Sequence, residues 1–204
     1  MRGARVRGAP ATRETQPDTH GSSRVFFALW PDAAVRAALE SLARDCAAQT
    51  GGRAPDVANL HLTLAFIGQV SASRVAMLRE IGRSTAAAVP SFALTLDRID
   101  AFHKQGIVWA GPASESRAVQ ELAAKLSALL TPAGFELEDR AFHPHVTLVR
   151  RARPRMLDTT RSGVLPVPIV WNVSRMTLAA SEHAHGALRY VAVDGWPLGG
   201  GATE

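Results

Sequence analysis

The sequence predicts an α+β fold with substantial antiparallel pairing between its strands. The main observation is the order of the segments: several apolar strands follow one another without a helix between them, which departs from strict βαβ alternation. The second observation is the composition, because 47% of the 204 residues are hydrophobic and 20% are charged, a balance typical of a globular chain. This composition excludes wholesale disorder, a collagen-like repeat and a fibrous coiled coil.

Two strands and two helices are expected in the first half of the chain. Apolar residues at spacings of three and four predict the helices, and alternating polarity predicts the second strand. Pro31 ends the first strand and opens the first helix, whereas Pro90 ends the second helix. The expected elements are a strand over residues 24–30, a helix from Asp32 to about Ala48, a strand over residues 60–67 and a helix over residues 73–88.

The second half is richer in strands. Its one helix, over residues 117–130, has an apolar stripe that includes Val119, Leu122 and Leu126, and Pro132 stops it. A loop that carries His103 joins the first two strands. The strands are expected over residues 92–96, 106–110, 142–149, 164–170, 175–180 and 189–193.

The positive charge of the chain is concentrated near its start. The net charge is +5, and the first 24 residues hold five arginines against Glu14 and Asp18, a net charge of +3. This segment is rich in Gly, Thr, Ser and Pro and poor in large apolar residues, which favours disorder. We therefore expect a disordered basic tail over residues 1–23, one domain over residues 24–198 and a flexible tail over residues 199–204.

Cysteine usage and hydropathy predict the compartment. The single cysteine, Cys46, lies on the apolar face of the first helix and has no partner for an internal disulfide, which is typical of a reducing compartment. No stretch approaches the roughly 18 apolar residues that indicate a membrane span. A cytoplasmic location away from the membrane is expected, with Cys46 in a structural role.

A histidine followed two residues later by a threonine occurs in two strands. His61 and Thr63 form the first pair, and His145 and Thr147 form the second pair 84 residues further on. Residues two apart in a strand point to the same face, so each histidine shares a face with its threonine. Because such polar pairs are costly in a dry core, we expect them to line a wet cleft between two similar lobes.

Two imidazoles and two hydroxyls in one cleft favour acid–base chemistry at phosphorus. Histidine has an ordinary pKa of about 6.5, so one ring can take a proton from water while the other donates one to a leaving oxygen. Each such proton transfer is typically worth about 10²–10⁴-fold in rate. Threonine hydroxyls can donate hydrogen bonds to anionic oxygens. The arrangement requires no metal, and no cofactor is expected.

These paired motifs resemble those of the 2H phosphoesterase superfamily, and more closely the bacterial and archaeal RNA 2′,3′-cyclic phosphodiesterases, also called 2′-5′ RNA ligases. The resemblance covers roughly residues 24–198. It implies a bilobal fold, in which two pseudo-twofold-related lobes of mainly antiparallel sheet carry helices on the outside and form an active-site groove between them. The segments that carry it are RVFFAL from residue 24, NLHLTLAFIG from residue 59, GIVW from residue 106, FHPHVTLVR from residue 142, RY from residue 189 and WPL from residue 196.

The same resemblance implies a role for each motif residue. His61 is the expected proton donor, His145 is the expected proton acceptor, and Thr63 and Thr147 bind the phosphate. Water attacks the 2′,3′-cyclic phosphate of an RNA end or of a cyclic nucleotide, which leaves a 2′-phosphate and a free 3′-hydroxyl. Two alternatives remain open: reversible 2′-5′ RNA ligation or hydrolysis at the same site, and a non-catalytic RNA-binding module. The protein is expected to be a monomer.

Arg150 has two interpretations. The family often carries a basic residue here, and a guanidinium could hold two phosphate oxygens at once. However, a spacing of five from His145 places Arg150 on the opposite face of a regular strand, so this role needs a bend or bulge. The alternative is a surface arginine in a basic segment, because residues 150–161 hold five arginines against Asp158, a net charge of +4. Such a segment is a plausible path for an RNA strand.

Two His-x-His pairs have a spacing that zinc can use. They are His143 with His145 and His183 with His185. Neither has acidic or cysteine ligands around it in a recognised pattern, so we expect no metal site. His183 and His185 are expected in a solvated loop before Gly186.

Aromatic residues raise the question of base stacking. Phe66 and Trp109 lie in apolar strands and are therefore expected in the core. Tyr190 is the better candidate for a substrate pocket, since its counterpart in the family also follows an arginine in the closing strand.

Overall fold

The computed structural model describes residues 23–156, 163–184 and 187–199. The tails expected over residues 1–23 and 199–204 lie almost entirely outside these residues, and so do Asp158, Arg161 and His185. None of the helices in the described residues is both long and apolar enough to cross a membrane.

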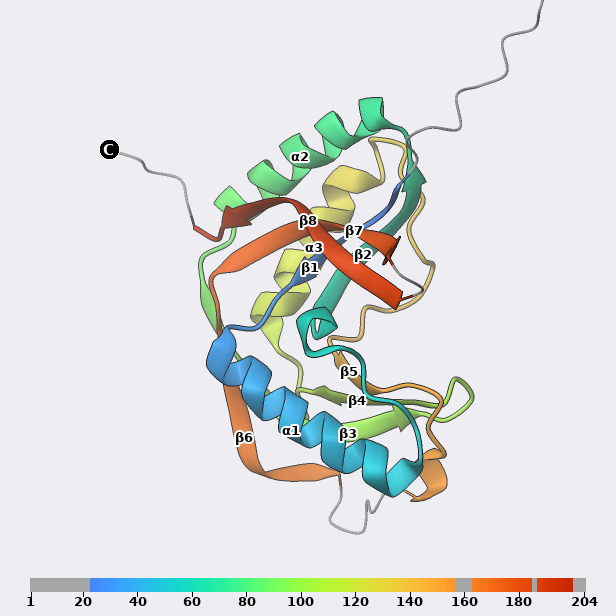
Figure 1. Ribbon diagram of the computed structural model, residues 1–204. Helices are drawn as coiled ribbons and strands as arrows, with labels where there is room; N and C mark the ends of the chain where they lie inside the picture. The colour runs from blue at the N-terminus through green and yellow to red at the C-terminus, as the bar shows by residue number, and fades with distance from the viewer. Residues whose placement is uncertain (1–22, 157–162, 185–186, 200–204) are drawn as a thin grey trace, which may run out of the picture.

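Over the described residues, the strands form one eight-stranded sheet in the order β6-β3-β4-β5-β2-β1-β7-β8 (Figure 1). All neighbouring strands are antiparallel. The α+β fold with antiparallel pairing predicted from the sequence is therefore confirmed. The strands are β1 (Ser23–Leu29), β2 (Leu62–Val70), β3 (Phe92–Phe102), β4 (Ile107–Gly111), β5 (Val146–Val149), β6 (Val164–Val173), β7 (Arg175–Ala184) and β8 (Ala187–Pro197).

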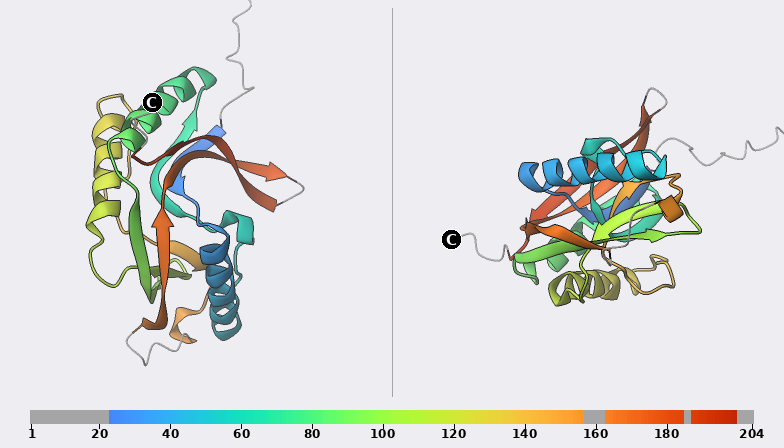
Figure 2. Two further views of the ribbon diagram at one scale, coloured as in Figure 1. Left: turned by 90° about the vertical axis from the view of Figure 1, so that its left-hand side faces the viewer. Right: turned by 90° about the horizontal axis from the view of Figure 1, so that it is seen from below.

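The sheet has two halves that meet where β2 pairs with β5. Helix α1 (Ala33–Thr50) packs on β5 and β6, whereas α2 (Ala72–Ala87) packs on β7 and β8 and α3 (Arg117–Leu130) packs on β2. Figure 2 shows α2 and α3 next to each other and α1 apart from them, over the other half of the sheet. Two short 3-10 helices, Val57–Asn59 and Pro154–Met156, precede β2 and follow β5. The predicted bilobal arrangement is thus built on a single sheet.

The apolar stripe predicted for the helix over residues 117–130 is buried. Val119, Leu122 and Leu126 of α3 have no exposed surface, and burial of such side chains is the main source of folding free energy. Cys46 of α1 is also buried, which raises the pKa of its thiol to about 11 and keeps it unreactive. Asp32 caps α1 by accepting a hydrogen bond from the backbone N–H of Val35 at 2.9 Å.

Several strands differ in length from the sequence-based expectation. β3 continues to Phe102 because residues 98–102 pair with β4. The polar side chains of Arg98 and Asp100, which form an ion pair with each other, interrupt the apolar pattern there. β5 begins only at Val146, after Pro144, whose nitrogen cannot donate to a ladder. The solvated loop predicted around His183 was wrong, since β7 runs to Ala184 and His183 pairs with Leu188 of β8.

Candidate active site

The two His-x-Thr segments meet at the junction of the two halves of the sheet. Leu62 of β2 pairs with Val146 of β5, and both side chains are fully buried. Because the pairing is antiparallel and the copies are 84 residues apart, a local twofold axis between Leu62 and Val146 relates one motif to the other. Each histidine precedes this pair and each threonine follows it. His61 and Thr147 therefore flank one end of the pair and Thr63 and His145 the other, all on the face opposite the core.

Each motif strand contains a bulge directly after its threonine. In β2, Ala28 and Phe27 of β1 pair with Thr63 and Ala65, so Leu64 has no partner. In β5, Trp109 and Val108 of β4 pair with Thr147 and Val149, so Leu148 has no partner. An extra residue in one strand reverses the alternation of side chains beyond it. Each bulge accordingly has two consecutive buried residues, first Leu64 with Ala65 and then Leu148 with Val149.

The bulge in β5 provides the change of face that Arg150 needs. With two buried residues in a row, the following side chain, Arg150, returns to the face of His145 and Thr147 and is exposed there. Its positive charge lowers the pKa of both His61 and His145, so the guanidinium lies within electrostatic reach of both rings. The structure thus brings Arg150 together with the four motif residues.

The bulge in β2 turns Phe66 to the same face. Phe66 occupies the position in the first motif that Arg150 occupies in the second, and 49% of its surface is exposed. The expectation that Phe66 belongs to the core was wrong, because a regular strand would have placed it on the buried face. Trp109 was correctly assigned to the core and is 4% exposed.

Backbone carbonyls orient both imidazoles in the same way. His61 Nδ1 lies 2.6 Å from the carbonyl oxygen of Asn59, and His145 Nδ1 lies 2.7 Å from that of His143. A carbonyl oxygen only accepts, so each Nδ1 carries a hydrogen and donates it. In the neutral rings Nε2 is therefore unprotonated, and His61 Nε2 lies 3.0 Å from the hydroxyl oxygen of Thr63, which can donate to it. Nε2 is therefore the nitrogen of each ring that the backbone carbonyls leave free to exchange a proton.

His61 is enclosed by aromatic rings. Trp30 stacks on it at 5.1 Å between ring centroids, and Phe26 and Tyr190 lie at 5.2 Å and 4.9 Å, the latter edge-on. Phe26 belongs to a small apolar cluster with Trp30 and Tyr190, separate from the main core. This burial lowers the pKa of His61 to about 4, because water no longer solvates the imidazolium, and the hydrogen bond to Asn59 offsets the effect only in part.

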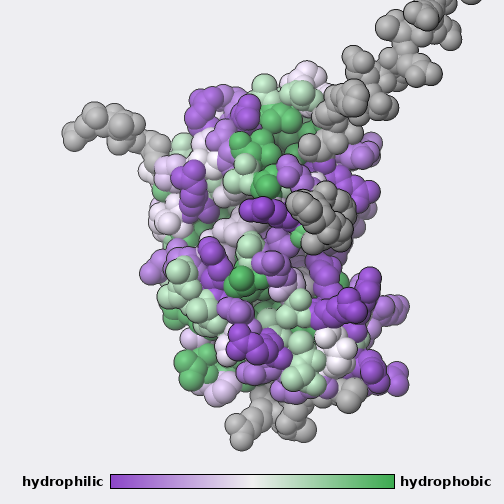
Figure 3. All heavy atoms as spheres, in the orientation of Figure 1, coloured by the Kyte–Doolittle hydropathy of each residue, from purple (hydrophilic) through white to green (hydrophobic). Residues whose placement is uncertain are grey.

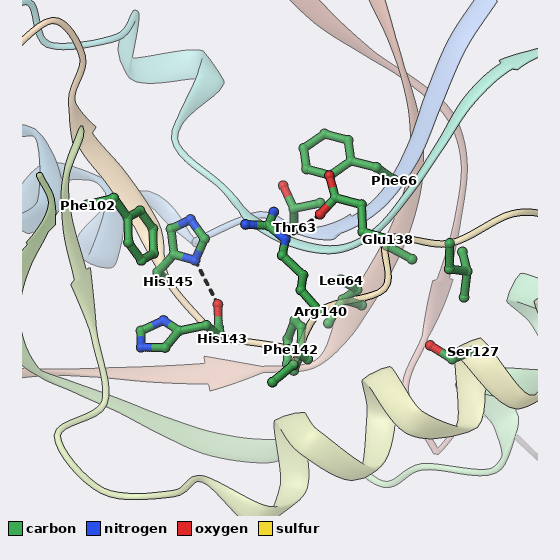
Figure 4. A pocket seen from close by; sticks show the side chains of 13 residues that line it. Thr63, Leu64, Phe66, Phe102, Ser127, Glu138, Arg140, Phe142, His143 and His145 are labelled. Carbon is green, nitrogen blue, oxygen red and sulfur yellow. Dashed lines mark hydrogen bonds and ion pairs between the residues drawn. The ribbon is translucent and has the colours of Figure 1, made fainter. Parts of the chain in front are cut away.

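His145 has more polar surroundings. Phe102 is edge-on to it at 5.1 Å, and His143 lies 6.0 Å away, measured between ring centroids. Burial again is the main cause that lowers the pKa of His145, and the nearby positive charges of His143, Arg140 and Arg150 lower it further. The hydrogen bond to the carbonyl of His143, dashed in Figure 4, acts in the opposite direction.

A cleft of about 280 Å³ opens beside His145 and Thr63. Phe66 lines it from β2 and Ser127 from α3, and the segment before β5 contributes Glu138, Arg140 and Phe142. Arg140 forms an ion pair with Glu138, and Figure 4 shows its guanidinium pointing toward His145 and Thr63. Neither Glu138 nor Arg140 could be recognised from the sequence, since both lie in a segment without regular structure and carry no motif.

A second group that the sequence analysis did not identify supports His61. The side chain of Asn59 donates to the carbonyl of Leu188 at 2.9 Å and accepts from the backbone N–H of Tyr190 at 3.2 Å. Asn59 thus links the start of β2 to β8 and fixes two of the groups that contact the His61 ring, the Asn59 carbonyl and Tyr190. The hydrogen bond from its backbone N–H to Asn59 holds Tyr190, the predicted pocket residue, against His61. Only the short distance in sequence between Asn59 and His61 could have indicated this role.

The described residues contain no group of three or more His, Cys, Asp or Glu side chains arranged to hold a metal ion. His143, the first member of one predicted His-x-His pair, instead lies edge-on to Trp109 at 4.6 Å between ring centroids.

The chain is similar to several known proteins over most of its length. The family model of the 2′-5′ RNA ligase superfamily matches residues 29–184. The RNA 2′,3′-cyclic phosphodiesterase of Escherichia coli K12 is 34% identical over 179 residues, which cover 86% of this chain and 96% of that protein. The protein of the same name from Archaeoglobus fulgidus is 28% identical over 143 residues, 68% of this chain and 79% of that protein.

A likeness of structure accompanies the likeness of sequence. The crystal structure of E. coli LigT in complex with 3′-AMP superposes with a TM-score of 0.76 and 31% identity, and the match covers 87% of this chain and 98% of that chain. The match of the family model, the related sequences and this superposition agree with the paired His-x-Thr motifs. The chain belongs to the 2′-5′ RNA ligase superfamily, within the 2H phosphoesterases.

Proposed function

We propose that the protein hydrolyses the 2′,3′-cyclic phosphate ends of RNA to 2′-phosphates, without a metal ion, using His61 as proton donor and His145 as proton acceptor. One observation carries the proposal: the β2–β5 junction brings two imidazoles, two threonine hydroxyls and Arg150 to one face of the sheet. The related proteins of E. coli and A. fulgidus named RNA 2′,3′-cyclic phosphodiesterase support the choice of substrate.

In the proposed reaction, a water oxygen attacks phosphorus while the bond from phosphorus to O3′ breaks. Nε2 of neutral His145 takes the proton that the water loses, and Nε2 of protonated His61 gives its proton to O3′. The products are a 2′-phosphate and a 3′-hydroxyl, and a proton exchange with solvent resets both rings. The attacking and leaving oxygens lie on opposite sides of phosphorus, which suits two imidazoles related by a local twofold axis.

The phosphate oxygens are proposed to bind between the rings. The hydroxyls of Thr63 and Thr147 would each donate a hydrogen bond, and Arg150 would add a charge-assisted one. Tyr190 would contribute to the pocket through its position against His61. LigT, with a TM-score of 0.76 to this chain, has been crystallised with 3′-AMP, which supports a nucleotide-sized site in this fold.

Because the pKa of His61 is low, the bound substrate must help to protonate this ring. With a pKa of about 4, His61 is mostly neutral near pH 7 and cannot donate a proton. The phosphodiester anion, placed beside both rings, favours their protonated forms and raises both pKa values. Binding of the substrate would therefore create the acid that the reaction needs.

The proposal is tested with a short RNA that ends in a 2′,3′-cyclic phosphate. We expect turnover in the presence of EDTA and a product with a 2′-phosphate, identified by its mobility and by phosphatase digestion. Loss of turnover in EDTA would point to a metal hydrolase, and binding without product would point to an RNA-binding module. A 3′-phosphate product would contradict the proposed direction of attack. A second RNA with a free 5′-hydroxyl shows whether ligation through a 2′-5′ bond competes.

A further inference from the structure

Exposed basic side chains from three distant segments gather beside the candidate active site. Arg53 follows α1, Lys104 lies in the turn between β3 and β4, and three arginines follow β5; all are exposed. Figure 3 shows hydrophilic residues gathered over the end of α1 and the β3–β4 hairpin. We name this surface the basic platform and define it as Arg53, Lys104, Arg151, Arg153 and Arg155.

Backbone hydrogen bonds fix the segments of the basic platform to one another. Arg53 and Arg150 exchange two bonds, of 2.8 and 2.9 Å, and the N–H of Ala152 donates to the carbonyl of Gly106 at 2.9 Å. The N–H of Arg153 donates to the carbonyl of Thr50 at 3.1 Å. The positive charges therefore lie on a fixed backbone rather than on independent loops.

These five cations have no carboxylate partner among the described residues, unlike six arginines elsewhere in the fold. None of the five forms an ion pair within the part of the chain that the structure describes. Like charges held close together repel one another, so an anion would stabilise this surface. The arginines that do pair with a carboxylate are Arg44, Arg79, Arg83, Arg98, Arg117 and Arg140.

One member of the basic platform has an unusual backbone conformation. Arg151 has a φ of 55°, and it is the single non-glycine residue with a positive φ in the described ranges. Glycine adopts this conformation more easily than a residue with a Cβ. The turn at Arg151 thus keeps a long basic side chain where the backbone alone would favour glycine.

The basic platform begins one residue beyond the candidate phosphate-binding residue. Arg150 lies within electrostatic reach of both histidines, and its backbone pairs with that of Arg53. A strand whose terminal phosphate contacts Arg150 would therefore have a row of cations directly beside it. A mononucleotide is too short to use them, whereas an RNA chain has a phosphate at every nucleotide.

We propose that the basic platform binds the backbone phosphates of the RNA chain that precedes the cyclic phosphate, so that the protein prefers RNA ends to free cyclic nucleotides. This inference rests on the proposed function, because it assumes that the cyclic phosphate reacts between His61 and His145. The substrate is then a polyanion, held at its end by the active site and along its length by the basic platform.

The test compares a cyclic mononucleotide with an oligonucleotide of about ten residues that ends in a 2′,3′-cyclic phosphate. The variant is the double substitution Arg53→Gln/Arg153→Gln, which leaves the turn at Arg151 intact. The control is Arg83→Gln/Arg117→Gln, which removes the same charge from α2 and α3. Both variants are checked by thermal unfolding, and KM is measured for each substrate between about 50 and 200 mM salt.

For the wild type, we expect the oligonucleotide to have a lower KM than the mononucleotide and a steeper salt dependence. Each phosphate contact on a single strand contributes a slope of about −0.7 in log affinity against log salt, which corresponds to about fivefold at 0.1 M salt. The Arg53→Gln/Arg153→Gln variant should therefore raise the KM of the oligonucleotide between about 5-fold and 25-fold, with less than a twofold change for the mononucleotide. The control should change neither.

Equal KM values and equal salt slopes for the two substrates in the wild type would overturn the inference while leaving the proposed function standing. So would a rise in KM of the same size in the control variant. If neither substrate is hydrolysed, the proposed function fails. Fluorescence anisotropy with an oligonucleotide that carries a 2′-phosphate then still tests the basic platform, and an unchanged Kd in the Arg53→Gln/Arg153→Gln variant would overturn it.

Discussion

The surroundings of His61 and His145 differ although the two residues occupy equivalent positions about a local twofold axis. Both rings donate from Nδ1 to a carbonyl two residues earlier, and both precede a threonine and a bulge. His61 then lies among Phe26, Trp30 and Tyr190, whereas positive charges surround His145. The residue beyond the bulge follows the same division, since it is Phe66 in the first copy and Arg150 in the second.

This difference teaches that the repeated backbone positions the two imidazoles, while the surroundings set their pKa values. Burial lowers the pKa of both rings, and that of His61 falls to about 4. Substitutions that change the surroundings of one copy of the motif at a time test this interpretation.

The largest expected effect comes from removing either imidazole. His61→Gln and His145→Gln should each lower kcat on a cyclic phosphate by about 10²–10⁴-fold, because each removes one proton transfer. The double variant should lose little more than the worse single variant, since the two rings act as a unit. Circular dichroism controls for folding. Near-wild-type turnover by either single variant would contradict the two-histidine mechanism.

The residues beyond the two bulges should differ in their contribution. Arg150→Gln should lower kcat/KM about 10- to 100-fold, the effect of losing a hydrogen bond to a charged group of about 1.5–3 kcal/mol. Phe66→Leu, at the equivalent position, keeps an apolar side chain and should cost less than about threefold. Steady-state kinetics on one cyclic nucleotide measure both, with Arg44→Gln as an arginine control on α1. A larger loss for Phe66→Leu would reverse the assignment of the two positions.

Sequence periodicity and one repeat predicted most of the fold and the centre of the site. Helix α3 has the predicted bounds, because Val119, Leu122 and Leu126 form an uninterrupted stripe. His61, Thr63, His145 and Thr147 were identified because alternation in a strand needs no knowledge of distant contacts. β3 was predicted too short because Arg98 and Asp100 interrupt its apolar pattern, although its pairing with β4 continues to Phe102.

What the sequence could not predict depends on register and on long-range contacts. A bulge depends on the pairing of two strands, so the face to which Phe66 points could not be predicted from its own strand. For Arg150, the sequence showed only that a phosphate-binding role would require a bend or bulge. Asn59 bonds to residues of β8 that are 129 and 131 positions away. Arg140 reaches the cleft from an irregular segment, whose path local propensity does not determine.

The pH dependence of the wild type follows from the two lowered pKa values. The proposed mechanism needs one protonated and one neutral ring, and kcat/KM reports the free protein. Because both pKa values lie below the ordinary 6.5, this state is most populated on the acidic side of that value. We expect a bell-shaped profile of kcat/KM with its maximum below pH 6.5 and a decline as the pH rises, while kcat has its maximum at higher pH. A kcat/KM maximum above pH 7 would contradict these pKa directions.

Substitution of Asn59 should affect only the first copy of the motif, which contains His61. Asn59→Ala removes the bonds to Leu188 and Tyr190, which should loosen the ring of Tyr190 and the carbonyl that orients His61. We expect kcat to fall about tenfold, with little change in KM, because the acid is misplaced rather than lost. Asn172→Ala on the exposed side of β6 is the matched control. A loss of stability with unchanged kcat would make Asn59 a structural residue only.

The smallest expected effect on the rate comes from opening the aromatic enclosure of His61. Trp30→Leu should admit water to one face of the ring, and since burial is the largest cause of its low pKa, the pKa of His61 should rise from about 4 toward 6.5. The pKa of His145, which does not contact Trp30, should stay unchanged. NMR titration of the imidazole Cε1 protons measures both, and inorganic phosphate should raise both in the wild type. The substitution should also move the maximum of kcat/KM toward higher pH, which should raise kcat/KM at pH 7 a few-fold. Titration of wild-type His61 and His145 at the same pH would show instead that the two copies are electrostatically alike, and the acid and base would then need another source of difference.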